Sequence, residues 1–255
     1  MSNPYISDRG APRSDYRPQA GPPLVRAQQL DLETVGYLRR VYGLFFGGIV
    51  SASAGAMTAL YVGAGDGAPP LVAWFANHWI LAIVGFFAAF FGMNAVRRVP
   101  RVNVAALFGF TFFTGLYVAP VLYIAGLLAS TGHTMTANPV RDAFLLSIAA
   151  FGGLTGYVLI TKRDFSFLRG FLSMGIFVLL GAMLLGMFVG GAVFQLAIAS
   201  VGVLLFGAYV LYDTSRMLRS GERSDPVGAA IGLFLNFLNI FLFILRILMS
   251  GSRRA

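Results

Sequence analysis

Residues 170–212 read GFLSMGIFVLLGAMLLGMFVGGAVFQLAIASVGVLLFGAYVLY, a run of 43 residues without a charged side chain. A helix needs about 20 mostly apolar residues to cross a bilayer, so this run has room for two such helices. Gly190 and Gly191 stand near its middle, where we expect a tight turn. The segment 177–188, FVLLGAMLLGMF, is apolar on all sides, whereas the strands of a membrane barrel alternate apolar and polar residues. The run therefore predicts two consecutive membrane-spanning helices.

The rest of the chain repeats this pattern in shorter stretches. Hydrophobic residues make up 57% of the 255 residues and charged residues only 11%, against roughly 25% charged residues in a soluble domain. So many long uncharged stretches in succession also exclude a soluble protein with buried helices. We therefore expect an all-α integral membrane protein with seven transmembrane helices. Their predicted ranges are 37–63, 77–96, 103–128, 141–161, 167–189, 192–218 and 227–249.

Arginine and lysine residues mark one side of the predicted helices. The loops 64–78 and 190–191 contain neither residue type, and 129–141 contains only Arg141. The positive-inside rule therefore places the N-terminus in the cytoplasm, and seven crossings place the C-terminus outside. Arg253 and Arg254 leave open a last segment that enters the membrane without crossing it. The basic loops contain Arg97, Arg98 and Arg101, then Lys162, Arg163 and Arg169, then Arg216, Arg219 and Arg223.

The N-terminal segment differs in composition from the rest of the chain. Residues 1–34 are rich in Pro, Arg and Gly and contain too few apolar residues to pack, which predicts a disordered, basic cytoplasmic tail. Residues 35–255 then form the transmembrane domain. We attribute the net charge of +9 mainly to topology, although basic segments also favour anionic lipid headgroups. Membrane lipids are the expected partners, and nothing else in the sequence indicates binding to nucleic acid.

The residue types that carry most enzyme and metal chemistry are scarce. The chain has no cysteine, which excludes disulfides and thiolate metal sites. Its two histidines, His78 and His133, fall in loops predicted outside the cell, so they supply neither a buried histidine metal cluster nor a catalytic base. The single lysine, Lys162, lies in a predicted cytoplasmic loop and cannot form a Schiff base inside the membrane. We therefore expect no enzyme and no resident cofactor.

Small residues recur at a regular spacing on the first predicted helix. Gly43, Gly47, Ser51 and Gly55 are four residues apart and therefore share one face of a helix. Small side chains on one face allow two membrane helices to approach closely. We expect a neighbouring helix to pack against this face.

Polar side chains gather in the last two predicted helices. Asp213 ends the long uncharged run, and a carboxylate at the centre of a membrane helix costs roughly 2.5–3.5 kcal/mol, so Asp213 should face other helices or water. Asn236, Asn239 and Arg246 share one stripe of the last helix at about 100° per residue. The turn near 219–226 brings Asp213 and Asn236 to similar depth, so we expect them to be neighbours.

Each of these polar features also has a purely structural interpretation. Asp213 can pair with Arg216, three residues further along the same helix. The stripe on the last helix can serve for hydrogen bonds between helices instead of lining a cavity. The residues by themselves leave both interpretations open.

At this point the sequence is similar to a known family. LYDTSRML at 211–218 followed by GLFLNFLNIFLFILRIL at 232–248 resembles the signature of the transmembrane Bax inhibitor motif family, in its bacterial branch. The resemblance covers about 37–249 and implies seven helices, with the last one near the centre, in a bacterial inner membrane. Further similar stretches are YLRRVYGLF at 37–45, ALFGFTFFTGLYVAP at 106–120 and AFLLSIAAFGGLTGY at 143–157.

The resemblance also implies a proton-sensitive calcium leak. In the family, an aspartate pair from the sixth and seventh helices acts as the pH sensor and forms part of the ion path. Asp213 matches the first aspartate, but the second position is Asn236, while Asn239 and Arg246 match the family pattern. Because one carboxylate is missing, we expect acid gating to be weak or absent. Asp213 is the candidate ligand for a transient Ca²⁺ ion, which prefers oxygen ligands.

Two functions remain open from the sequence. The first is a pH-sensitive cation leak, expected to carry calcium, with Asp213 and Asn236 in the ion pathway and with Asn239, Arg246 and Arg216 as supporting polar residues. The second is a non-conducting membrane regulator that binds a membrane-anchored AAA protease through its N-terminal tail, which the resemblance also implies for bacterial relatives.

Overall fold

Eight helices and no strand are found in residues 23–65, 67–219 and 225–250, the residues that this computed structural model describes. Seven of these helices are long and apolar enough to cross a membrane, which confirms the predicted fold class. Apart from the start of α1, the ends of the spans lie within about two residues of the predicted ones. The helices are α1 (Pro23–Tyr61), α2 (Pro70–Asn77), α3 (Trp79–Val96), α4 (Val102–Ser130), α5 (Pro139–Thr161), α6 (Leu168–Val189), α7 (Ala192–Arg219) and α8 (Pro226–Met249).

The first helix starts earlier than the sequence indicated. α1 begins at Pro23, so 23–34, which we assigned to a disordered tail, is helical. Proline is favoured in the first turn of a helix, and this segment also contains Leu, Gln, Ala and Glu, which are good helix formers. Part of the predicted tail is therefore helical, although the candidate membrane span within α1 begins only at Leu32. The remainder of the predicted tail, 1–22, lies outside the described residues.

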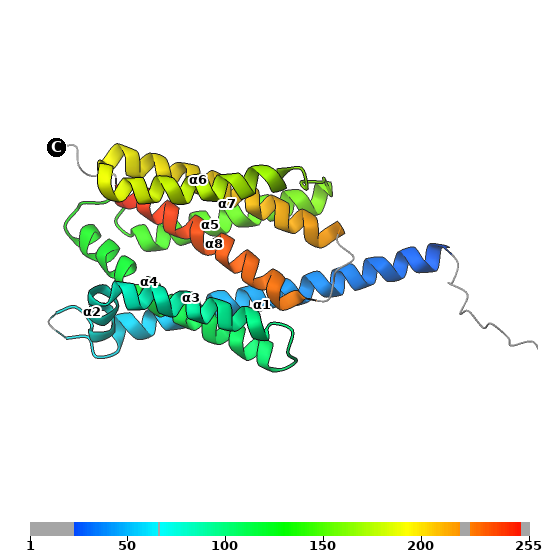
Figure 1. The fold of residues 1–255 in the computed structure, drawn as a ribbon, viewed down its shortest axis with the longest axis horizontal. Helices are drawn as coiled ribbons and strands as arrows, with labels where there is room; N and C mark the ends of the chain where they lie inside the picture. Colours follow the sequence, from blue (N-terminus) through cyan, green and yellow to red (C-terminus); the bar gives the residue numbers. More distant parts are fainter. Residues whose placement is uncertain (1–22, 66, 220–224, 251–255) are drawn as a thin grey trace, which may run out of the picture.

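The last helix lies between two groups of helices. Figure 1 shows α1, α2, α3 and α4 on one side, α5, α6 and α7 on the other, and α8 running obliquely between them. α8 contacts α1, α4, α5 and α7, and half of its residues are buried. A helix that is apolar nearly all round belongs in the centre of a bundle, because each of its faces meets another helix. The expected central position of the last helix is therefore confirmed.

α1 and α4 approach so closely that their backbones touch. A Cβ atom on Gly55 would collide with the carbonyl oxygen of Phe112, and one on Gly115 would collide with that of Ala52. The Ser51 hydroxyl donates a hydrogen bond to the carbonyl oxygen of Phe108, also on α4, at 2.9 Å. The predicted small-residue face therefore packs as expected from Gly47 to Gly55, whereas nothing lies within 4 Å of a Cβ placed on Gly43.

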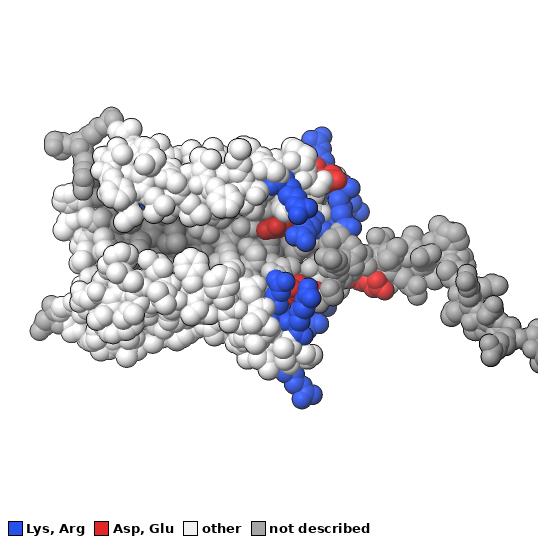
Figure 2. All heavy atoms as spheres, in the orientation of Figure 1, with Lys and Arg blue, Asp and Glu red and all other residues white. Residues whose placement is uncertain are grey.

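Charged side chains gather at one end of the molecule. Figure 2 shows Lys, Arg, Asp and Glu clustered where α3, α5 and α7 end, whereas the other end is nearly free of them on this face. We call the end where the charged side chains gather the basic end. α8 runs from the basic end to the opposite one (Figure 1), so the last helix crosses the full depth of the molecule instead of entering and returning. The turn between α6 and α7 at that opposite end uses Gly190 and Gly191, both at positive φ, as predicted.

Candidate functional site

Asp213 of α7 and Asn236 of α8 are bonded to each other. The Asn236 side-chain Nδ2 donates a hydrogen bond to Asp213 Oδ2 at 2.7 Å. Asn236 is buried, with 6% of its surface exposed, whereas Asp213 is only partly buried. A bond to an ionised acceptor in such surroundings is stronger than one between neutral groups in water. The sequence-based prediction that these two residues are neighbours is confirmed.

Arg216 does not form the ion pair that was the alternative role for Asp213. The ion pairs found among the described residues join Arg97 to Asp225, Arg141 to Asp142 and Arg219 to Asp164. Arg216 lines the same cavity as Asp213, but its guanidinium lies beyond the 4.0 Å limit of an ion pair. Asn236 is therefore the bonded partner of Asp213.

A polar cavity of about 340 Å³ leads from the basic end to Asp213. At its mouth, Arg97 Nε lies 3.3 Å from Asp225 Oδ2. Asp225 also caps α8, because its Oδ1 accepts a hydrogen bond from the backbone N–H of Gly228 at 2.7 Å. This carboxylate thus ties the end of α3 to the start of α8. We call the space the basic-end cavity; its charged lining residues are Arg97, Arg98, Arg216, Asp213 and Asp225.

Three buried hydroxyl groups lie next to Asp213. The phenol of Tyr42 on α1 faces the hydroxyls of Thr155 on α5 and Thr214 on α7. All three oxygens are buried, and within the described structure none makes a hydrogen bond with acceptable geometry. Buried polar atoms without partners are uncommon and mark a place where water or an ion can be accepted. The sequence did not indicate this cluster, because single hydroxyls scattered over three apolar helices form no pattern.

Three phenylalanine rings pack together next to these hydroxyls, on the side away from the basic end. Phe45, Phe151 and Phe237 come from α1, α5 and α8, and their ring centroids are 4.8 Å, 5.9 Å and 5.8 Å apart. All three side chains are at most 5% exposed. We call this set the aromatic layer. Phe45 lies one turn beyond Tyr42 along α1, and Phe151 lies one turn before Thr155 along α5, so the layer adjoins the hydroxyl cluster.

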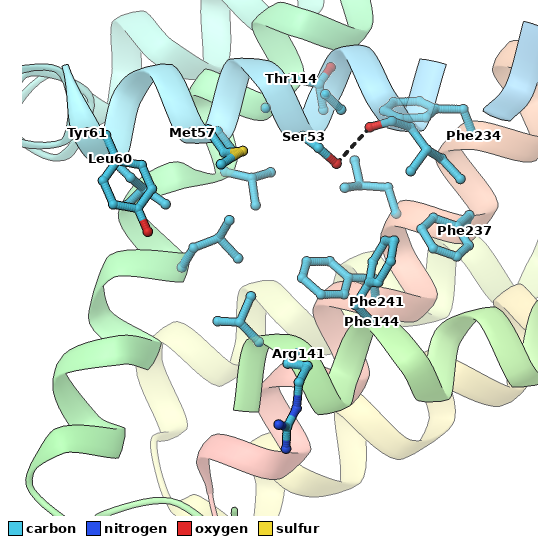
Figure 3. Close-up of a pocket in the computed structure, with 18 of the residues that line it drawn as sticks. Ser53, Met57, Leu60, Tyr61, Thr114, Arg141, Phe144, Phe234, Phe237 and Phe241 are labelled. Carbon is cyan, nitrogen blue, oxygen red and sulfur yellow. Dashed lines mark hydrogen bonds between the residues drawn. The ribbon is translucent and has the colours of Figure 1, made fainter. Parts of the chain in front are cut away.

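A second, largely apolar cavity of about 420 Å³ begins at the aromatic layer and extends away from the basic end. Figure 3 shows it between α1, which contributes Ser53 and Met57, and the rings of Phe144 and Phe241 on α5 and α8. Phe237 belongs to both the aromatic layer and the wall of this cavity. We call it the apolar cavity. The order along the molecule is therefore basic-end cavity, Asp213 with the hydroxyl cluster, aromatic layer and apolar cavity.

Two of the predicted supporting residues lie elsewhere. Asn239 donates its hydrogen bond to the carbonyl oxygen of Leu235 on its own helix, at 2.7 Å. Arg246 is ten residues beyond Asn236, which is about 15 Å along a helix, and it lines cavities near Gln195 at the opposite end. The predicted polar stripe therefore divides into separate parts, and only Asn236 contacts Asp213.

Asp213 and its described neighbours offer fewer oxygen atoms than a resident calcium ion needs. The described residues contain no group of three or more His, Cys, Asp or Glu side chains that could hold a metal ion. Ca²⁺ requires about six to eight oxygen ligands, whereas this site offers one carboxylate, one amide and the nearby hydroxyls of Tyr42, Thr155 and Thr214. A calcium ion would thus keep much of its water here.

Comparison with known proteins identifies one matching family and several relatives of this chain. The family described as "Inhibitor of apoptosis-promoting Bax1" matches residues 34–253. An uncharacterized protein of Campylobacter jejuni is 34% identical over 86% of this chain and 90% of its own length. An uncharacterized membrane protein of Vibrio cholerae is 34% identical over 89% and 96%, respectively. A Golgi anti-apoptotic protein of vaccinia virus is 28% identical over 86% and 87%. The chain therefore belongs to the Bax inhibitor-1-like family of membrane proteins.

Proposed function

We propose that this protein is a slow, passive pathway for cations, with Ca²⁺ as the expected ion. The observation that carries the proposal is the position of Asp213, a carboxylate held inside the membrane domain between two cavities that reach toward opposite ends. An ionisable residue inside a membrane domain is costly to keep, and such residues usually belong to ion or proton pathways. Family membership agrees with this reading.

Two features of the site make the proposed flux slow. Three arginines and two aspartates line the basic-end cavity, so an entering cation meets more positive than negative charge. The aromatic layer then separates Asp213 from the apolar cavity, and an apolar constriction resists hydration and ion passage. Both features support a regulated leak and not a wide channel.

The experiment that tests the pathway is replacement of Asp213 by asparagine, followed by calcium flux into liposomes containing the purified protein. Asn keeps the shape of the side chain but removes the charge that attracts a cation, so flux should fall at least about tenfold. Asp164→Asn is the matched control, because Asp164 lies in the exposed loop after α5, and its flux should stay unchanged. Equal loss in both variants, or undiminished flux in Asp213→Asn, would contradict the proposal.

The alternative function remains a regulator that binds a membrane-anchored AAA protease. What supports it is α1, whose N-terminal part extends beyond the other helices at the basic end (Figure 1), where it is accessible to a partner outside the membrane. The tail segment 1–22, which that binding would also use, lies outside the described residues. Absence of flux through the unmodified protein at every pH would favour this alternative over the leak.

We further propose that the basic end faces the cytoplasm of a bacterial inner membrane. The support is the gathering of basic loops at that end (Figure 2), together with the bacterial relatives. Because the chain has no cysteine, single cysteines report orientation cleanly. Val99→Cys and Ser166→Cys should resist an impermeant thiol reagent added to intact spheroplasts, whereas Ala137→Cys in the opposite loop should react. The reverse pattern of labelling would invert the orientation.

A further inference from the structure

Arg246 carries a positive charge that the described residues leave without a partner. It lies on α8 one turn before the helix ends, at the end opposite to the basic one, and its side chain is exposed. Within the described residues it makes neither an ion pair nor a hydrogen bond. Arg141, the other arginine described at this end, pairs with Asp142 at 2.9 Å. An unpaired guanidinium among apolar helices calls for an anion.

Two cavities meet at Arg246. The first, of about 430 Å³, is also lined by His133, Ser250 and the start of α7 at Gly191 and Ala192. Among the described residues, no carboxylate lines it, and the first backbone N–H groups of a helix add a partial positive charge. We call it the headgroup cavity. Its surroundings suit a phosphate group.

The second cavity is apolar and continues from the first. It has a volume of about 460 Å³ and is lined on α6 by Leu180, Met183, Leu184 and Met187. Gln195 and Arg246 belong to the linings of both cavities, so the two spaces share one border. We call this second space the chain groove. Because α6 is a membrane-spanning helix, the groove adjoins the hydrocarbon of the bilayer.

We propose that Arg246 binds the phosphate of a phospholipid, with one acyl chain lying in the chain groove along α6. The ligand must combine an anionic group with an apolar chain, because a charged cavity and an apolar groove meet at a single arginine. A membrane phospholipid of the adjacent leaflet has this chemistry and is present wherever the protein is. The bound lipid supplies the counter-charge that Arg246 lacks among the described residues and joins α6, α7 and α8 at this end. This inference does not depend on the cation pathway.

The test is lipid binding to the purified full chain in a neutral detergent, followed by native mass spectrometry and by thermal unfolding. Phosphatidylglycerol should remain bound and raise the unfolding temperature of the unmodified protein. Arg246→Gln should weaken this binding about tenfold, because a guanidinium–phosphate contact is lost. Arg141→Gln is the matched control and should bind the lipid as the unmodified protein does.

Further measurements test the headgroup cavity and the chain groove separately. Leu184→Trp fills the chain groove and should weaken lipid binding while Arg246 stays in place, so the proposal remains testable if Arg246→Gln fails to fold. Inorganic phosphate and diacylglycerol should each bind at least about tenfold more weakly than phosphatidylglycerol. Equal binding of inorganic phosphate would indicate a simple anion site. Equal binding of diacylglycerol, or unchanged lipid binding in Arg246→Gln, would likewise overturn the proposal.

Discussion

Asn236→Asp should give this protein a steep dependence of calcium flux on pH that the unmodified chain lacks. In the structure, the Asn236 amide donates to Asp213 Oδ2 at 2.7 Å. An amide does not titrate, so this bond persists as long as Asp213 is ionised. A second carboxylate at the same distance would repel the first, and a proton shared by the pair relieves the repulsion. The contact between α7 and α8 would then depend on proton concentration.

Flux should be measured between about pH 5 and 8 in liposomes. Asn239→Asp is the matched control, because Asn239 lies on the same helix but bonds to the carbonyl of Leu235 instead of Asp213. It adds a carboxylate without creating a pair, so its pH profile should resemble that of the unmodified protein. A double variant that exchanges the two groups, Asp213→Asn with Asn236→Asp, has one carboxylate again and should lose the steep dependence. A steep transition in the unmodified protein would refute the argument.

Much of the architecture follows from the distribution of charge along the chain. Six uncharged stretches were enough to place seven spans, because a carboxylate or guanidinium is rarely left in hydrocarbon without a function. The pairing of Asp213 and Asn236 was also predictable, since α7 and α8 are joined by a short connection. Residues on two helices at similar distances from such a connection lie at similar depth.

The rest of the site depends on contacts between helices that are far apart in the sequence. The ion pair of Arg97 with Asp225 joins the end of α3 to the start of α8, and no spacing rule connects the two residues. The facing hydroxyls of Tyr42, Thr155 and Thr214 come from three helices, and a single Thr in an apolar helix is usually satisfied by its own backbone. Periodicity reports which face of a helix is buried, but not which other helix covers it.

Phe237→Ala should raise calcium flux about tenfold or more, which corresponds to about 1.4 kcal/mol removed from the barrier. Phe237 contacts the rings of Phe45 and Phe151 and also lines the apolar cavity, so its loss opens the aromatic layer toward that cavity. Water can then reach the hydroxyl cluster from both sides, and an ion need not shed its hydration at an apolar constriction. Phe237→Leu keeps the layer apolar and filled, so its flux should rise much less.

In Phe237→Ala, the effect of lost packing must be distinguished from the effect of removing the aromatic layer as a barrier to ions. A buried Phe→Ala change costs about 3–5 kcal/mol of stability wherever it occurs. Phe206→Ala is the matched control, because Phe206 is similarly buried but stacks on Phe243 and borders neither the basic-end cavity nor the apolar cavity. If the aromatic layer is the barrier, Phe237→Ala conducts faster while Phe206→Ala is only less stable. A similar rise in both variants would mean that general loosening of the helices, not removal of the layer, admits the ion.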